Sequence, residues 1–195
     1  MRDQWYGDDR DVLKWSTLVH LARRESVPGI LHIAMYRASR PIAPLATAFG
    51  PVDPPDEVLR HFRDLGDIQR LAAATGLEID VIKSPFAHRV TYFDEVCGAV
   101  RARTGRVLVF LDPDIGIEAE QGGPEHVTSA DVARVFDALQ PGDLLVCYQH
   151  ARRQKGWRGR ARRAFAHAPG IPSFDVEVVE SELVRDVLMF SVKKS

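Results

Sequence analysis

The 195-residue chain lacks several features that would place it in a specialised class. No apolar run approaches the roughly 20 residues that a membrane-spanning helix requires, and the N-terminus has no apolar signal-peptide core. The only cysteines are Cys97 and Cys147, so neither a disulfide framework nor a cysteine-based zinc site is indicated. These absences predict a cytoplasmic protein with no membrane partner, in which both cysteines are small core residues.

The composition is that of an ordinary globular chain, with 45% hydrophobic and 27% charged residues. Apolar stretches with strand character alternate with amphipathic helical stretches. We expect helices at about 8–24, 54–75, 92–103 and 128–139, and strands at 30–36, 77–83, 107–111, 143–150, 174–180 and 187–192. This pattern predicts a single three-layer α/β domain over residues 1–195, with a mostly parallel sheet, helices on both faces and an antiparallel C-terminal edge.

The strand expected at residues 107–111 ends abruptly in Asp112-Pro-Asp114. It is an unbroken apolar run, which is typical of a central strand buried on both faces. Ligands of open α/β sheets bind at the carboxyl ends of the strands, so Asp112 and Asp114 are candidate catalytic residues, with Glu118 as a nearby substrate-binding candidate. The alternative is a turn whose Asp side chains only hydrogen-bond the loop backbone.

A second apolar strand, at residues 143–150, ends in Gln149 and His150. If it runs parallel to the strand at 107–111 as its neighbour, both residues emerge at the same sheet edge as the two aspartates. His150 is therefore a catalytic candidate, with a structural role as the alternative, and Gln149 is a substrate-binding candidate. His32, within the first strand, is expected to be a core histidine.

The helix expected at residues 8–24 begins with Asp8 or Asp9 as N-cap. Asp8, Asp11 and Lys14 make its start richer in polar groups than a cap needs, so they are further substrate-binding candidates; a solvated helix start is the alternative. Helical spacing places Lys14 away from a buried face that consists of Val12, Trp15, Leu18, Val19 and Ala22.

Acidic residues are absent between Leu144 and Phe174, and from Leu144 to the C-terminus ten basic residues face five acidic ones. Such asymmetry in a chain of net charge -1 points to a polyanionic partner. We expect nucleic acid, with DNA favoured, against the alternative of a solvated helix. Arginines and a lysine would bind phosphates and Trp157 would stack on bases. The candidate nucleic-acid-binding residues are Arg152, Arg153, Lys155, Trp157, Arg158 and Arg160.

The segment after the first strand lacks the glycine-rich turn by which backbone approaches a nucleotide-like cofactor. Residues 37–51 contain one glycine and several prolines, and are expected to form a long irregular loop. We therefore expect no cofactor and no metal. Carboxylates at a strand end without a cofactor loop favour hydrolysis: a carboxylate orients water and stabilises an oxocarbenium-like centre, while a histidine assists the leaving group.

The two motifs, Asp112-Pro-Asp114 and the strand ending in His150, resemble the active-site motifs of the uracil-DNA glycosylase superfamily. The resemblance implies that Asp112 or Asp114 holds water, that His150 assists departure of a flipped-out base, and that Trp157 and its neighbouring arginines lie on DNA. Asp114 stands where that family has an aromatic residue or Asn, which suits a modified base. The resulting expectation is a DNA glycosylase that hydrolyses the N-glycosidic bond of a non-standard base.

A second resemblance rests on Asp11-Val-Leu-Lys14 and Asp112-Pro113. These segments are similar to those of large-ribosomal-RNA adenine methyltransferases, in which the first lies in the N-terminal helix and the Asp-Pro motif holds the target amino group. The resemblance implies an S-adenosylmethionine-dependent fold, whose cofactor glycines are missing after Tyr36. Two further readings remain open: a Mg²⁺-dependent nuclease that uses Asp112, Asp114 and Glu118, and a nucleic-acid-binding module without enzymatic activity.

Overall fold

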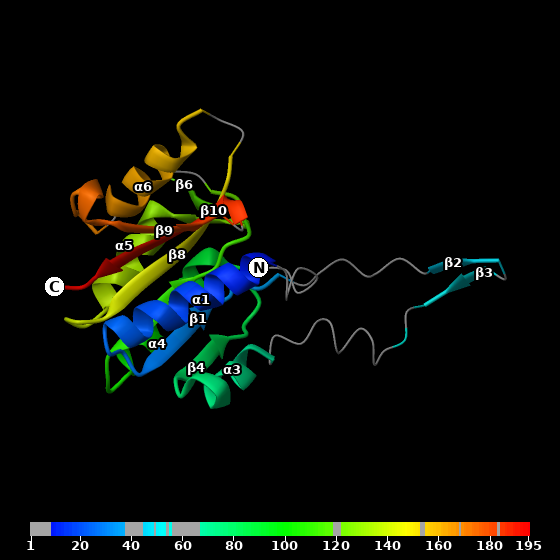
Figure 1. Cartoon of the computed structure of the whole chain (residues 1–195), viewed down its shortest axis with the longest axis horizontal. Helices are drawn as coiled ribbons and strands as arrows, with labels where there is room; N and C mark the ends of the chain where they lie inside the picture. Colours follow the sequence, from blue (N-terminus) through cyan, green and yellow to red (C-terminus); the bar gives the residue numbers. More distant parts are fainter. Residues whose placement is uncertain are drawn as a thin grey trace.

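The computed structural model describes residues 9–37, 45–48, 50–53, 55, 67–118, 122–152, 155–167, 169–182 and 184–195. Its main sheet has six strands in the order β4-β1-β5-β8-β10-β9 (Figure 1). The strands are β4 (Glu78–Ile82), β1 (Gly29–Ile33), β5 (Val107–Leu111), β8 (Leu144–His150), β10 (Val184–Lys193) and β9 (Glu177–Ser181). The first four are mutually parallel, while β10 runs antiparallel to both β8 and β9.

Helices cover both faces of this sheet (Figure 1). One face packs against α1 (Asp9–Arg24) and α3 (Asp67–Thr75), and the other against α4 (Arg89–Arg101), α5 (Ser129–Ala138) and α6 (Trp157–His167). Side chains alternate between the two layers, as the strand pleat requires: Leu108 and Phe110 face α1, whereas Val107 and Val109 face α4 and α5. The α/β fold class, the parallel sheet and the antiparallel C-terminal edge are thus as the sequence predicts.

The central strand is buried throughout, as expected for a strand that is covered by helices on both faces. Helix α5, at the position expected for a helix, begins with a capping box. The Thr128 hydroxyl accepts a hydrogen bond from the Asp131 amide, and the Asp131 carboxylate accepts one from the Thr128 amide. Both cysteines are free and buried, as predicted.

The first helix differs from its predicted orientation. Val12 is 54% exposed and Val19 only half-buried, whereas Leu13, Lys14 and Leu21 are buried. The prediction that Lys14 projects away from the buried face was therefore wrong. The physical reason is that Lys14 has a buried carboxylate as its partner, so an ion pair, which hydrophobic periodicity does not report, sets the rotation of α1.

Short elements complete the structure. The expected irregular loop at residues 37–51 contains part of an antiparallel pair, β2 (Leu45–Thr47) with β3 (Gly50–Val52). After the central strand, β6 (Gly116–Glu118) pairs in parallel with β7 (His126–Thr128), and η2 (Ser173–Asp175) is a short 3-10 turn before β9. Most of the helix predicted at 54–75 lies outside the described residues. No helix in the described part of the chain is long and apolar enough to cross a membrane.

Candidate functional site

The sheet topology brings the three predicted catalytic residues to one edge. The chain passes from β1 to β4 on one side and then from β5 to β8 on the other, so the strand order reverses between β1 and β5. Such a switch point is where open α/β sheets bind ligands, outside the carboxyl ends of the strands. Asp112 and Asp114 follow β5, Arg37 lies beyond the end of β1, and His150 ends β8. We call this region the carboxyl edge.

Asp112 belongs to a buried charge cluster beneath the carboxyl edge. Its residue is 1% exposed, and its Oδ1 lies 3.0 Å from the Nζ of Lys14 on α1. The Nε2 of His32 on β1 lies 3.1 Å from its other carboxylate oxygen, Oδ2. Burial alone would raise the pKa of Asp112, but the Lys14 ammonium and the hydrogen bond from His32 hold that pKa well below its usual range. Asp112 is therefore an anion inside the protein.

The remaining partners of the cluster fix Lys14 and His32. Lys14 Nζ lies 3.2 Å from Asp11 Oδ1 and 4.5 Å from the centroid of the Tyr148 ring. Burial opposes the charge of Lys14, but the carboxylates of Asp112 and Asp11 raise its pKa above the ordinary lysine value. The His32 ring stacks on Phe110 at 5.1 Å and meets Trp15 edge-on at 5.5 Å.

His32 departs in one respect from the expected satisfied core histidine. Its Nδ1 atom is buried and has no hydrogen-bond partner among the described residues.

The structure brings together three residues that the sequence predicts as site residues. The predicted substrate-binding residues Asp11 and Lys14 meet the predicted catalytic Asp112 in the interior of the protein.

Asp114, two residues further on, lies closer to solvent. Its side chain is 18% exposed and forms an ion pair with the guanidinium of Arg37. Burial tends to raise the pKa of Asp114, yet neighbouring positive charge, including that of Arg37, holds it below the ordinary value. Arg37 also approaches Glu125, with 3.9 Å between Nη1 and Oε2. Of the two carboxylates in the Asp-Pro-Asp motif, only Asp114 presents an anion near the surface of the carboxyl edge.

His150 lies at the same edge and belongs to a separate group of charged residues, which also contains Asp186 and Arg10. Its Nε2 is 3.0 Å from Asp186 Oδ2, and its Nδ1 is 3.0 Å from the carbonyl oxygen of Ala151. Arg10 of α1 contacts the same Asp186 oxygen at 2.6 Å. Burial tends to raise the pKa of Asp186, but the hydrogen bond from Arg10 lowers it further than burial raises it. The pKa of Asp186 therefore lies below its usual value. The side chain of His150 is 35% exposed, so it is accessible, but both ring nitrogens already have partners.

Gln149 holds the backbone of the loop that follows Asp114. Its Oε1 accepts a hydrogen bond from the Ile117 amide at 2.9 Å, and its Nε2 donates to the carbonyls of Ile115 and His150. Gly116 has a φ of +131°, and a Cβ there would lie 2.4 Å from the Gln149 side chain. Gln149, a predicted substrate-binding residue, thus uses its side-chain amide to hold the backbone of this loop in place.

Two other predicted residues contact each other. Arg152 Nη1 lies 2.5 Å from Glu118 Oε2, and its Nη2 donates to the Ile117 carbonyl at 3.0 Å. The pair joins the end of β8 to β6, on the side of the sheet opposite α1. Asp8 and Arg153, which complete the predicted sets, lie outside the described residues.

The basic segment forms α6, which begins near the carboxyl edge and runs back along the sheet (Figure 1). Lys155 and Arg160 are exposed. Trp157 is half-buried against the core, and the guanidinium carbon of Arg158 lies 4.7 Å from its ring centroid. Trp157 therefore does not present an open ring face of the kind that the stacking prediction requires.

The residues after β1 do not fit S-adenosylmethionine. Ala34 and Met35 are buried, and the Met35 amide donates a hydrogen bond to the Tyr92 hydroxyl at 3.0 Å. The Tyr36 carbonyl accepts one from the Phe86 amide at 2.7 Å, so the loops after β1 and β4 are bonded to each other. The described part of the turn, up to Arg37, thus lacks a glycine and has its Met35 amide already hydrogen-bonded, and Lys83 follows β4 where an acid would hold ribose hydroxyls.

The carboxylates proposed for a Mg²⁺ site do not converge. Asp112 pairs with Lys14, Asp114 with Arg37 and Glu118 with Arg152. Within the described residues, no group of three or more His, Cys, Asp or Glu side chains could hold a metal ion. The described residues therefore provide no cluster that suits the nuclease reading.

Three residues at or beneath the carboxyl edge were not among the predicted site residues. Arg37 and Asp186 are the ionic partners of Asp114 and His150, and His32 is a partner of Asp112. A histidine within an otherwise apolar strand is a signal that could have marked His32. Arg37 and Asp186 carry no such signal, because their partners are 77 and 36 residues away in the chain.

The comparisons with known proteins are sparse. No protein-family model matches the chain, and no curated protein matches it. Among solved structures, it is similar to a DUF574 family protein from Streptomyces avermitilis, with 12% sequence identity and a TM-score of 0.42. That alignment covers 95% of this chain and 82% of the other. The similarity assigns neither an activity nor a ligand to this chain.

Proposed function

We propose that this protein is a nucleic-acid-acting hydrolase of the DNA glycosylase kind, which cleaves the N-glycosidic bond of a non-standard or modified base. The observation that carries the proposal is the Asp114–Arg37 pair at the carboxyl edge: a carboxylate held anionic, partly exposed, at the switch point of the sheet. Asp112 cannot handle water in this arrangement, because it is 1% exposed and paired to Lys14 and His32. Asp114 takes that role in the proposal.

The chemistry suits an anion and a cation side by side. As the bond between C1′ and the base nitrogen breaks, positive charge develops on the sugar and negative charge on the base. Asp114 would stabilise the oxocarbenium-like sugar and align water, whose oxygen bonds to C1′ while its proton neutralises the departing base. Arg37, or His150 after release from Asp186, would stabilise the base. The base has to be unstacked before it can reach these groups.

The test uses purified protein and labelled oligonucleotides that carry unmodified or modified cytosines and other bases, with and without EDTA. We expect alkali-labile abasic sites that persist in EDTA, and a loss of at least about 100-fold in rate for Asp114→Asn. The control is Asp94→Asn, on the exposed outer side of α4, which should keep full activity. Direct nicks abolished by EDTA would favour a nuclease, and equal rates for Asp114→Asn and the parent protein would contradict the role of Asp114.

A second candidate is favoured by the Lys14–Asp112 contact. This pair joins the two segments on which the resemblance to ribosomal-RNA adenine methyltransferases rests, although 98 residues separate them. Because the turn after β1 does not fit S-adenosylmethionine, the second candidate is a protein of that arrangement that binds nucleic acid without methyl transfer. Binding of oligonucleotides with no base excision would favour it, whereas transfer of label from S-adenosylmethionine to RNA or DNA would contradict both candidates.

A further inference from the structure

One face of α6 is a basic surface. Ala161, Phe165 and Ala166 pack into the core, whereas Arg160, Arg163 and His167 are exposed. Because they are three and four residues apart, these exposed residues lie on the same side of the helix. Arg163 forms no ion pair with any described residue. The helix also contains no acidic residue, so this surface has a net positive charge.

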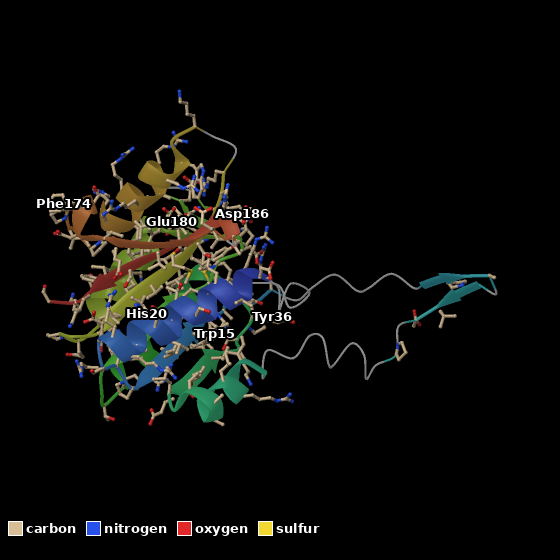
Figure 2. The ribbon with its side chains drawn as sticks, viewed as in Figure 1. Trp15, His20, Tyr36, Phe174, Glu180 and Asp186 are labelled. Atoms are coloured by element: carbon tan, nitrogen blue, oxygen red, sulfur yellow. The ribbon has the colours of Figure 1, made fainter. Side chains whose placement is uncertain are left out.

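An exposed aromatic side chain lies just beyond the end of this helix. Phe174, in η2, is 77% exposed, and it is the only aromatic among the exposed large apolar side chains of the described residues. Figure 2 labels it at the far end of α6. A single exposed apolar side chain is ordinary in itself, so the argument depends on the position of Phe174 next to the basic helix.

The backbone that carries Phe174 is tied to the helix. Arg162 Nη2 donates hydrogen bonds to the carbonyl oxygens of Phe174 at 3.0 Å and Val176 at 2.6 Å. The Asp175 amide donates to the Pro172 carbonyl at 3.0 Å, which closes the turn. Phe174 is therefore an exposed ring on an anchored backbone, so little conformational entropy is lost when a partner packs against it. The adjacent Asp175 is the first acidic residue after Asp143 in the chain.

We propose that the surface of α6 and η2 binds single-stranded nucleic acid, with phosphates on Arg160 and Arg163 and one base stacked on Phe174. This inference rests on the proposed function, since it names the form of substrate that the site receives. Phe174 lies at the end of α6 away from the carboxyl edge, so a bound strand would run along α6 to reach Asp114 (Figures 1 and 2). A single strand is specified because stacking on an exposed ring requires an unpaired base, whereas a duplex offers the arginines only its phosphates. In this arrangement Phe174 takes the stacking role that the sequence suggests for Trp157, whose ring is covered by Arg158.

The experiment measures fluorescence anisotropy of a labelled single-stranded oligothymidine and of a duplex of equal length, over a range of salt concentrations. We expect the parent protein to prefer the single strand, and Phe174→Ala to weaken single-strand binding by about 5- to 100-fold. Phe174→Trp should retain binding. Arg160→Gln/Arg163→Gln should lower the slope of log K against log salt by about 1 to 1.5, whereas Phe174→Ala should leave that slope unchanged.

Matched controls are Val90→Ala, which removes an exposed apolar side chain on α4, and Arg101→Gln, which removes an exposed arginine on the same helix. Both should bind like the parent protein. Equal binding by Phe174→Ala and the parent, equal affinity for duplex and single strand, or no binding to either would overturn the inference. If neither the single strand nor the duplex bound, a protein partner would be the alternative ligand for Phe174.

The outcome is separable from that of the proposed function. Asp114→Asn should bind the single strand normally while it loses base excision. Phe174→Ala should raise the KM for excision and leave kcat within about twofold. If the parent protein bound the single strand but excised no base, the result would contradict the proposed hydrolase activity and would still support single-strand binding by the surface of α6 and η2.

Discussion

At the scale of single residues, the buried ion pair determines what the Asp-Pro-Asp motif can do. Two aspartates separated only by Pro113 have opposite surroundings: Asp112 is enclosed by Lys14 and His32, whereas Asp114 reaches the surface with Arg37. The first is suited to holding α1 against the sheet, and the second to meeting a ligand.

Lys14→Met is expected to lower the free energy of unfolding by about 3–5 kcal/mol, because the carboxylate of Asp112 would remain buried without its counter-charge. Lys14→Met/Asp112→Asn removes both charges and should recover part of that loss. Equilibrium urea unfolding measures each difference. The control is Lys193→Met, which breaks the exposed pair with Glu25 and should cost less than about 1 kcal/mol. If Lys14→Met lowered the free energy of unfolding as little as the control does, the result would contradict a stabilising buried pair between Lys14 and Asp112.

Gly116 gives a second prediction at this scale. Gly116→Ala combines a strained positive φ with a Cβ placed 2.4 Å from the Gln149 side chain, so Gln149 must release the Ile115–Ile117 backbone. We expect a loss of about 2–4 kcal/mol in the free energy of unfolding. Gly170→Ala also has a positive φ but meets nothing within 4 Å, and should lose only about 1 kcal/mol. Thermal and urea unfolding of the two variants would separate the cost of the positive φ from the cost of the contact with Gln149. Equal losses in the free energy of unfolding would show that the Gln149 side chain moves aside without cost.

At the scale of elements, the start of α5 is the helix terminus with the clearest sequence signature. Thr128→Ala removes the hydroxyl that accepts from the Asp131 amide and should lower the free energy of unfolding by about 1 kcal/mol. Thr128→Ser retains the hydroxyl and should lose less than half as much. Urea unfolding compares them, and a Ser variant as unstable as the Ala variant would assign the effect to the lost methyl group.

Elements whose signals are local were predictable from the sequence. The apolar run of β5, the capping box of α5 and the antiparallel pair of β9 and β10 follow from patterns within a few residues. The rotation of α1 was not predictable, because it depends on Asp112, a residue 98 positions away from Lys14. The same limit applies to the candidate site: the sequence suggests Asp114 and His150 as candidates, but the ionic partners of both are set by tertiary packing.

At the scale of the whole molecule, the buried cluster gives stability a defined dependence on pH. The pKa of Asp112 is lowered on folding, so its contribution is present above the unfolded-state pKa of about 3.9 and is lost as the pH falls towards the folded-state pKa. The pKa of Lys14 is raised on folding, so its contribution is complete below a pH of about 10.4 and is lost only as the pH rises through the folded-state pKa.

We therefore expect the free energy of unfolding to fall below a pH of about 4, and to fall less steeply for Lys14→Met/Asp112→Asn than for the parent protein. Urea unfolding between a pH of about 3 and 7 measures both slopes. The pKa of Asp186 is also lowered on folding, so the double variant should retain part of the slope. Identical slopes for the two proteins would mean that Asp112 does not titrate as its contacts require.

The order of the strands also bears on how the folded protein behaves at high concentration. Among the described residues, the sheet ends at β4 and β9, and no described strand pairs with the outer side of either one. Both edges carry exposed acids: Glu78 and Asp80 in β4, and Glu180 in β9. Asp80 is paired with Arg103 and Glu180 with Arg158, so a second copy that added its own edge strand would have to pack against charged side chains and their ion pairs. These edges therefore disfavour aggregation by continuation of the sheet.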